Sequence, residues 1–339
     1  MLKHATPFFA IAAAAAMILT SPIPAQAQEI GPTPPEDIAR TRANFPNPHD
    51  AGVDALVTAL IGMHRGDDHT LYINRVELPD SAPALYVELV LAGEENHPVR
   101  QQLWVPHRRD NQLQVRVCEL PLAMRDLVVG MWAAPGLFPS ARLEQYSSLG
   151  DLSVEGGDGH YTIEADHTLP IAREGAIEYD LRFERTPAGV RWTDAGRAIN
   201  GDEIFALNLN MKTRPTMPEA RELDGGILVY DLREGFVGAS PVNKDSIVFY
   251  YSEWTMDGFL IDTTNQPRRG GHVFTIPDEH KALRSWNLGV IGLRQGGIRR
   301  IYDPKSHSGM LNGQLKPFRG QPMALITELE CISVKDNTP

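Results

Sequence analysis

Cysteine is scarce in this sequence. The chain has 339 residues but only two cysteines, Cys118 and Cys331, which stand far apart. Two cysteines alone make no metal site, and we expect both to be small buried residues in strands, with a disulfide bridge as the alternative. The cysteines thus predict neither a metal centre nor a required cross-link.

An excess of positive charge is also absent. Acidic residues outnumber basic ones by 43 to 32, for a net charge of -11. The clustered positive field of a nucleic-acid-binding protein is therefore not expected. We interpret two short basic segments, residues 107–109 (HRR) and Arg299 with Arg300, as solvated strand ends.

Motifs for common chemistries are missing as well. The sequence contains no G-x-S-x-G, P-loop, H-E-x-x-H or dinucleotide-binding pattern. Residues 64–69 (HRGDDH) are interpreted as a solvated helix end rather than a metal site. His160 and His167 fall on opposite faces of a strand, so they do not predict a shared site. We expect no cofactor and no metal.

A long membrane-spanning run is missing, although the N-terminus is apolar. Residues 7–20 (PFFAIAAAAAMILT) are shorter than the roughly 20 residues of a membrane span and follow Lys3. Residues 25–27 (AQA) fit a small-x-small cleavage site. We expect residues 1–28 to be a cleaved signal peptide, with an uncleaved anchor as the alternative. The mature chain would be secreted or periplasmic and would have no membrane span.

Two helices are expected early in the chain. Residues 29–50 are rich in proline and polar residues, as in a linker, and Asp50 is suited to cap a helix over residues 51–66. Short alternating runs separated by turn clusters then predict antiparallel strands. A second helical piece is expected over residues 121–132.

These patterns predict a mainly β protein of two domains. We expect residues 51–200 to form a closed antiparallel barrel or a strongly curved sheet, with a leading helix. Residues 201–224 are expected to be a junction, and residues 225–336 a second β-rich domain with five strand-like runs. There is no internal repeat.

One helix is expected in the second domain, over residues 281–293. Leu283, Trp286 and Val290 share a face of this helix, because they are three or four positions apart. A single short helix must bury that face on the sheet. Trp286 would then lie between helix and sheet, where it could form the floor of a cavity.

The order of these elements resembles the FKBP-type peptidyl-prolyl cis-trans isomerases. The segments that carry the resemblance are GILVYDLREG, VFYYSEWTMDGFLIDTT, ALRSWNLGVIGLRQGG, IRRIYDP and LITELECISV, in the order and near the spacing of that family. The resemblance implies an α+β domain, in which a five-stranded antiparallel sheet carries one short helix. It also implies an isomerase of X-Pro bonds in proline-containing polypeptides.

The resemblance assigns roles to individual residues. Trp286 would form the floor of the pocket for the proline ring, Tyr251 a wall, and Asp262 the pocket carboxylate. Phe274 matches an aromatic wall, and Leu283 would supply a backbone N–H and an apolar wall. No nucleophile is needed, because an apolar pocket with a few polar groups can favour the twisted amide.

Three positions depart from the family pattern. Ile261 stands where a phenylalanine is usual, and His307 or Ser308 stands where the flap usually has a tyrosine. Thr327 replaces an aromatic residue of the last strand. These departures leave an alternative open, a non-catalytic binding protein whose second domain serves as a docking module.

The first domain resembles the T-type phycobilin lyases (the CpcT/CpeT group), whose barrel is lipocalin-like. The similarity lies in LYVELVLAGEENHPVRQQLWVPHRRDNQLQVRVCELP and in GDGHYTIEADHT. In that family the barrel holds a tetrapyrrole, so a small apolar or tetrapyrrole-like ligand is implied; a barrel filled by its own side chains is the alternative. The candidate lining residues are Tyr72, Tyr86, Arg100, Gln102, Trp104 and Tyr161.

Together these patterns predict an exported isomerase or folding helper, a chaperone for proline-containing polypeptides. Its barrel would recruit a client or a small ligand. A heavily altered pocket would favour the binding-protein alternative instead.

Overall fold

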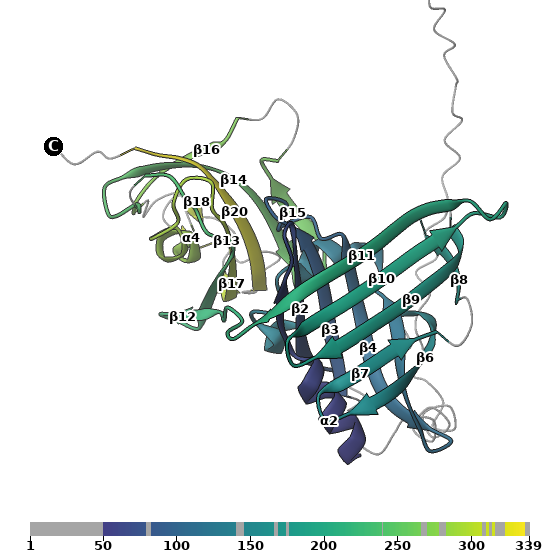
Figure 1. Cartoon of the computed structure of the whole chain (residues 1–339). Helices are drawn as coiled ribbons and strands as arrows, with labels where there is room; N and C mark the ends of the chain where they lie inside the picture. Colours follow the sequence, from purple (N-terminus) through teal and green to yellow (C-terminus); the bar gives the residue numbers. More distant parts are fainter. Residues whose placement is uncertain are drawn as a thin grey trace, which may run out of the picture. The chain divides into compact units, whose positions relative to one another are not determined.

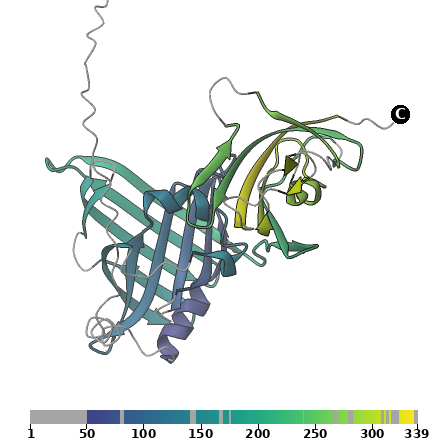
Figure 2. The same cartoon turned by 180° about the vertical axis from the view of Figure 1, so that it is seen from behind.

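The computed structural model divides into two compact units, Met1–Asn44 and Phe45–Pro339. It describes residues 50–78, 83–139, 146–165, 169–173, 176–238, 240–265, 270–277, 283–306, 310–311, 314–315 and 323–335, all of the second unit (Figures 1 and 2). The expected signal peptide and linker lie outside the described residues, except for Asp50. No helix in the described part of the chain is both long and apolar enough to span a membrane.

Asp50 begins the first helix, as the sequence predicts. Its carboxylate accepts hydrogen bonds from the backbone N–H groups of Gly52 and Val53 at 2.8 and 3.0 Å, which caps α2 (Ala51–Leu60). The expectation that this helix runs to residue 66 is wrong, because α2 ends at Leu60 and β1 (Gly62–Arg65) follows it. β1 pairs with strands on both sides, so sheet hydrogen bonds replace helical ones.

Ten strands of the described chain close into an antiparallel barrel (Figure 1). β10 pairs with both β9 and β11, and β11 pairs with β1 to complete the ring. β8 (Leu169–Arg173) runs along β9 beyond the end of β7. The barrel strands are β1 (Gly62–Arg65), β2 (His69–Glu77), β3 (Pro83–Leu91), β4 (Arg100–Arg109), β5 (Gln112–Glu119), β6 (Ser147–Gly157), β7 (His160–Glu164), β9 (Ala176–Thr186), β10 (Gly189–Arg197) and β11 (Glu203–Arg214).

The segment expected as a junction, residues 201–224, contains two strands. β11 closes the barrel, and β12 (Arg221–Leu223) pairs with the next strand along the chain. The side chains of β11 alternate between exposed and partly buried positions. That alternation is typical of a strand with one covered face. The barrel sequence therefore extends to Arg214.

The barrel interior is lined by buried apolar side chains. Inward positions of the strands form one cluster with the apolar face of α2, which contributes Val53, Leu56, Val57 and Leu60. The rings of Trp104, Phe183 and Trp192 meet edge to face, with centroids 5.1 to 6.1 Å apart. These side chains occupy the inside of the barrel as a packed core.

The C-terminal part of the chain forms a second antiparallel sheet. Its strand order is β12-β13-β17-β20-β14-β15, and β16 also pairs with β14. The segment VFYYSEWTMDGFLIDTT contributes to two strands, β14 and β15, which pair with each other. The strands are β13 (Ile227–Arg233), β14 (Ser246–Thr255), β15 (Leu260–Thr263), β16 (His272–Thr275), β17 (Ile298–Ser306) and β20 (Met323–Lys335).

The remaining elements are short. α3 (Leu122–Val128) ends earlier than the expected helix over residues 121–132, because the chain turns at Gly130 with φ +74°. It is followed by a 3-10 turn, η1 (Pro135–Leu137). α4 (Arg284–Gly289) covers the middle of the helix expected over residues 281–293. β18 (Met310–Leu311) and β19 (Gln314–Leu315) form a separate two-stranded ladder.

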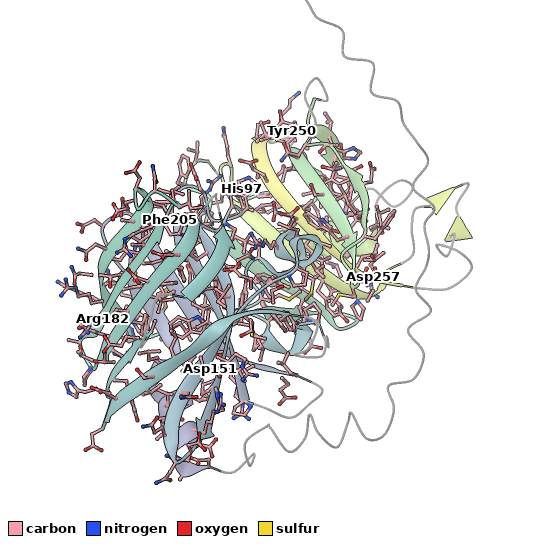
Figure 3. All side chains as sticks on the ribbon, turned by 90° about the vertical axis from the view of Figure 1, so that its right-hand side faces the viewer. His97, Asp151, Arg182, Phe205, Tyr250 and Asp257 are labelled. Carbon is pink, nitrogen blue, oxygen red and sulfur yellow. The ribbon has the colours of Figure 1, made fainter. Side chains whose placement is uncertain are left out.

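A second apolar core joins the outside of the barrel to one face of the second sheet. The outward side chains of β2 to β5 and the segment around α3 contribute Tyr72, Tyr86 and Trp132. The second sheet contributes Trp254 and Ile326, among others. In Figure 3, Asp151 and Arg182 lie on the barrel, while Tyr250 and Asp257 lie on β14 and the turn after it.

Both cysteines are buried free thiols in strands, as the sequence predicts. Cys118 lies in β5 and Cys331 in β20, and each is 1% exposed. Burial raises the pKa of the Cys118 thiol to about 12 and that of the Cys331 thiol to about 11. Both therefore remain neutral apolar side chains.

Candidate active site

An aromatic cluster lies on the face of the second sheet that α4 covers. The Trp286 ring contacts Tyr251 and Phe249 of β14, at centroid distances of 4.8 and 5.4 Å. It also contacts the ring of His272 in β16 at 5.6 Å. Trp286 is 6% exposed, whereas Tyr251 is half-buried. Residues from three elements, far apart in the sequence, thus meet around one indole ring.

The close approach of α4 to β17 fixes the position of Trp286. A Cβ on Gly289 would stand only 2.2 Å from Cδ1 of Ile301. Only a glycine leaves room for the helix backbone at that distance from the strand. Trp286, Val290 and Leu283 all pack into the same apolar core, as their helical spacing predicts.

Tyr251 and Asp262 are joined directly. The Tyr251 hydroxyl donates a hydrogen bond of 2.6 Å to Oδ2 of Asp262, and Oδ1 of Asp262 accepts from the backbone N–H of Thr263 at 2.8 Å. Both side chains reach solvent. Ile261 precedes Asp262 in β15 and is partly buried. The site therefore has a polar edge beside its aromatic centre.

The other candidate residues lie at different distances from Trp286. Phe274 is 1% exposed and packs edge to face on Phe249, 6.0 Å away, so it supports the cluster from behind that ring. Leu283 is the N-terminal cap residue of α4, and its carbonyl accepts a hydrogen bond of 3.0 Å from Trp286. His307 lies outside the described residues.

Sequence reasoning missed Glu253 as a site residue. It is 9% exposed, and Oε1 accepts a hydrogen bond of 3.2 Å from the hydroxyl of Thr327 in β20. Burial, reinforced by the charge of Asp262, raises the pKa of its carboxyl to about 7. Strand alternation could have indicated this position, because residues 249, 251 and 253 of one strand lie on the same face of the sheet.

Three segments that were expected to be solvated contain buried side chains instead. Arg299 and Arg300 are 4% and 1% exposed, because each donates to acceptors from other elements. His64 was expected on a solvated helix end, but it lies in β1 at 0% exposure. His107 of the HRR segment is also buried, while Arg109 is exposed.

The candidate barrel-lining residues divide between two faces. Arg100, Gln102, Trp104 and Tyr161 belong to the interior. Arg100 Nε donates to Oδ2 of the buried Asp194 at 2.9 Å, and Trp104 Nε1 donates to Oε1 of Gln102 at 3.0 Å. Two pairs of polar side chains in the interior are thus joined by hydrogen bonds.

Tyr72 and Tyr86 face the other way. They lie in the core that joins the barrel to the second sheet, because they alternate with inward residues along β2 and β3. Tyr72 stacks on Trp132 with centroids 3.8 Å apart. The Tyr86 hydroxyl donates to the buried Glu88 at 2.5 Å. The prediction that these two tyrosines line the barrel is wrong.

A short helix that holds a tryptophan over an antiparallel sheet defines the kind of α+β domain that the sequence resembles. No family profile matches the chain. It is 30% identical over 80 residues to a curated FK506-binding protein of Neisseria meningitidis serogroup B, a match that covers 24% of this chain and 71% of that protein. The chain belongs to the family of FK506-binding proteins.

Three solved structures are also similar. FkpA from Escherichia coli aligns with 19% identity and a TM-score of 0.28, over 35% of this chain and 53% of FkpA, so the chain spans about half of it. The N-terminal domain of FKBP42 from Arabidopsis thaliana gives 19% identity and 0.29, over 36% of this chain and 97% of that domain. A peptidyl-prolyl cis-trans isomerase from Pseudomonas syringae pv. tomato gives 21% and 0.27, over 36% and 84%.

Proposed function

We propose that this chain is a peptidyl-prolyl cis-trans isomerase that acts on X-Pro bonds at the Trp286 cluster. Membership of the FK506-binding protein family supports this reaction. The observation that carries the proposal is the contact of Tyr251 with both Trp286, 4.8 Å between ring centroids, and Asp262, 2.6 Å between oxygens. An apolar ring surface and a polar edge are thereby adjacent.

The reaction needs little more than this combination. Rotation about an X-Pro bond is slow because amide resonance must be broken, with a barrier of about 18–20 kcal/mol. An aromatic floor can hold the proline ring away from water while polar groups bind the twisted amide better than the planar one. Trp286 would hold the ring, and Tyr251 with Asp262 would form the polar wall.

The test is prolyl isomerisation in a protease-free peptide assay with the mature chain. Trp286→Ala removes the proposed floor, whose burial is worth about 1.5–3 kcal/mol, so catalytic efficiency should fall roughly 10- to 100-fold. Phe259→Ala is the control, since this aromatic side chain is 63% exposed in the turn before β15. Circular dichroism checks that both variants fold. An inactive, well-folded parent chain would refute the proposal.

A second candidate is a binding protein without catalysis. The observation that favours it is that Ile261 and Thr327 stand at two positions where the family usually has aromatic residues. Thr327 is 2% exposed and donates a hydrogen bond to Glu253. In that case proline peptides would bind without any faster isomerisation.

A ligand in the barrel is a separate part of this second candidate. A coloured, ligand-bearing purified protein would support the tetrapyrrole-like ligand that the lyase resemblance implies for the barrel.

Export and chaperone action are part of the same proposal. The apolar run and the Ala-Gln-Ala site of residues 1–28 support cleavage by a signal peptidase and a periplasmic or secreted mature chain. N-terminal sequencing of the exported protein tests this, with a first residue directly after the Ala-Gln-Ala site expected, at Gln28 or Glu29. Proline-containing polypeptides in that compartment would be the clients.

A further inference from the structure

A buried carboxyl group lies inside the aromatic site. Glu253 follows Tyr251 by two positions in β14 and pairs with Asp262 on one side and Thr327 on the other. It is 9% exposed, although no arginine or lysine among the described residues pairs with it. The Thr327 hydroxyl donates a hydrogen bond to it at 3.2 Å. Among the residues that the structure describes, this carboxyl group therefore has no cationic partner.

The floor of the site faces this group. The indole N–H of Trp286 favours the ionised form of the Glu253 carboxyl, but it makes no hydrogen bond of good geometry to any acceptor in the described part of the chain. Trp286 is 6% exposed, so this N–H is a buried donor without a full partner. An incomplete polar pair at the centre of an apolar cluster indicates that a ligand completes it.

The charges around Glu253 are of one sign. Asp262 from β15 and Asp303 from β17 both disfavour its ionisation. From β16, His272 contacts the Trp286 and Tyr251 rings. On the opposite face of the sheet, Arg300 is bound to Glu328. The site therefore gains negative potential when Glu253 ionises, and no arginine or lysine within the described ranges forms an ion pair with Glu253.

We propose that Glu253 makes this site select prolyl substrates that carry a positive charge next to the proline. The proposal rests on the isomerase function proposed above and names its substrate class. A substrate ammonium or guanidinium group would provide the counter-charge that Glu253 lacks among the described residues, and the faces of Trp286 and Tyr251 favour cations as well. A neutral neighbour of proline gains neither contribution.

The selection depends on pH in a definite direction. Because the pKa of Glu253 is about 7, its carboxyl is mostly neutral below that pH and charged above it. Preference for cationic peptides should therefore appear as the pH rises through about 7 and fade as it falls. A lysine side chain in the peptide stays charged across about pH 5.5–8.5, so it does not contribute to the change.

The experiment compares three peptides that differ only before proline, with Lys, Gln or Glu at that position. Catalytic efficiency is measured for the full mature chain across the pH range, and peptide affinity is measured by calorimetry. The Lys-to-Gln ratio should rise roughly tenfold through neutrality, as expected for charges several ångströms apart in a partly screened site. Glu253→Gln should give a low ratio that does not change with pH.

The control variant is Glu155→Gln, which removes the same charge from an exposed position in β6. It should retain the parent ratio and its pH dependence. A parent ratio that is constant with pH, or a Glu253→Gln variant that keeps the rise, would overturn the proposal. The parent curve needs no substitution, so a folding defect in the variant does not block the test.

The two proposals fail in different ways. A chain that binds the Lys peptide more tightly above neutral pH, without accelerating any isomerisation, refutes the isomerase function but keeps Glu253 as the selector of charge. A chain that isomerises all three peptides equally keeps the isomerase function and refutes the selection. Absence of binding to every peptide refutes both.

Discussion

Replacing Arg300 by methionine should destabilise the whole described fold. Arg300 is 1% exposed in β17 and donates to two backbone carbonyls of α3, those of Leu127 at 2.6 Å and Asp126 at 2.5 Å. It also donates to Glu328 at 2.8 Å, and its guanidinium lies 5.1 Å from the centre of the Trp254 ring. One side chain thus ties the second sheet to α3.

The magnitude follows from the groups that lose their donor. Breaking a buried ion pair by removing one partner costs about 3–5 kcal/mol, and the two carbonyls lose hydrogen bonds to a charged group. Methionine would fill part of the volume and pack on Trp254, which should offset about 1 kcal/mol of this loss of stability. We therefore expect a net loss of about 3 kcal/mol in the free energy of unfolding.

The assay is urea unfolding followed by circular dichroism at constant pH. Arg182→Met is the matched control, because Arg182 makes its ion pairs to Glu164 and Glu184 on the exposed barrel surface and should cost less than about 1 kcal/mol. If the second sheet then unfolds separately, Arg300→Met will also show two transitions. A loss below about 1 kcal/mol in a single transition would refute the reasoning.

Two further substitutions test other parts of the structure. Burial lowers the pKa of His64 to about 4, so as the pH falls below about 6.5 the unfolded chain binds a proton that the folded chain does not. The free energy of unfolding should therefore fall by about 3 kcal/mol between pH 6.5 and 4. The His64→Gln variant should lose this pH dependence in denaturation experiments, and an unchanged dependence would contradict the prediction. Replacing Gly by Ala in an exposed helix usually stabilises a protein by about 1 kcal/mol, but Gly289→Ala should destabilise this fold and weaken peptide binding, because the new Cβ would clash with Ile301. The second substitution Ile301→Val should restore part of both the stability and the binding. If neither recovers, the clash is not the cause.

The position of Trp286 could be predicted from the sequence because it depends on local periodicity. Its spacing to Leu283 and Val290 fixes one helical face, and that face packs on the sheet as expected. The barrel was also predictable, since its strands alternate and follow one another as antiparallel neighbours. Both features are set by residues close together in the chain.

The buried charges could not be predicted in the same way. Arg300 looks like a solvated strand end because its local neighbours are polar, yet its acceptors lie near residue 127, far away in the sequence. Glu88 is similar, since Trp132 Nε1 and Gly130 N–H complete its hydrogen bonds at 2.7 and 2.9 Å. Local pattern cannot supply partners that only the tertiary fold brings together. The end of α2 could not be predicted for the same reason, because the residues that follow it form β1, which pairs with the distant strand β11.

The two faces of the second sheet have different tasks, and strand alternation separates them. Along β17, Ile301 faces α4 while Arg300 faces the barrel; along β20, Thr327 faces Glu253 while Ile326 joins the core shared with the barrel. The barrel therefore attaches to the face opposite the aromatic cluster, so attachment does not require the site to be covered. A one-residue slip of either strand would exchange the faces and place Arg300 against α4. Because Arg300 donates to the carbonyls of Asp126 and Leu127 on the barrel side, it also holds β17 in the register that presents Ile301 to Gly289 and so positions Trp286.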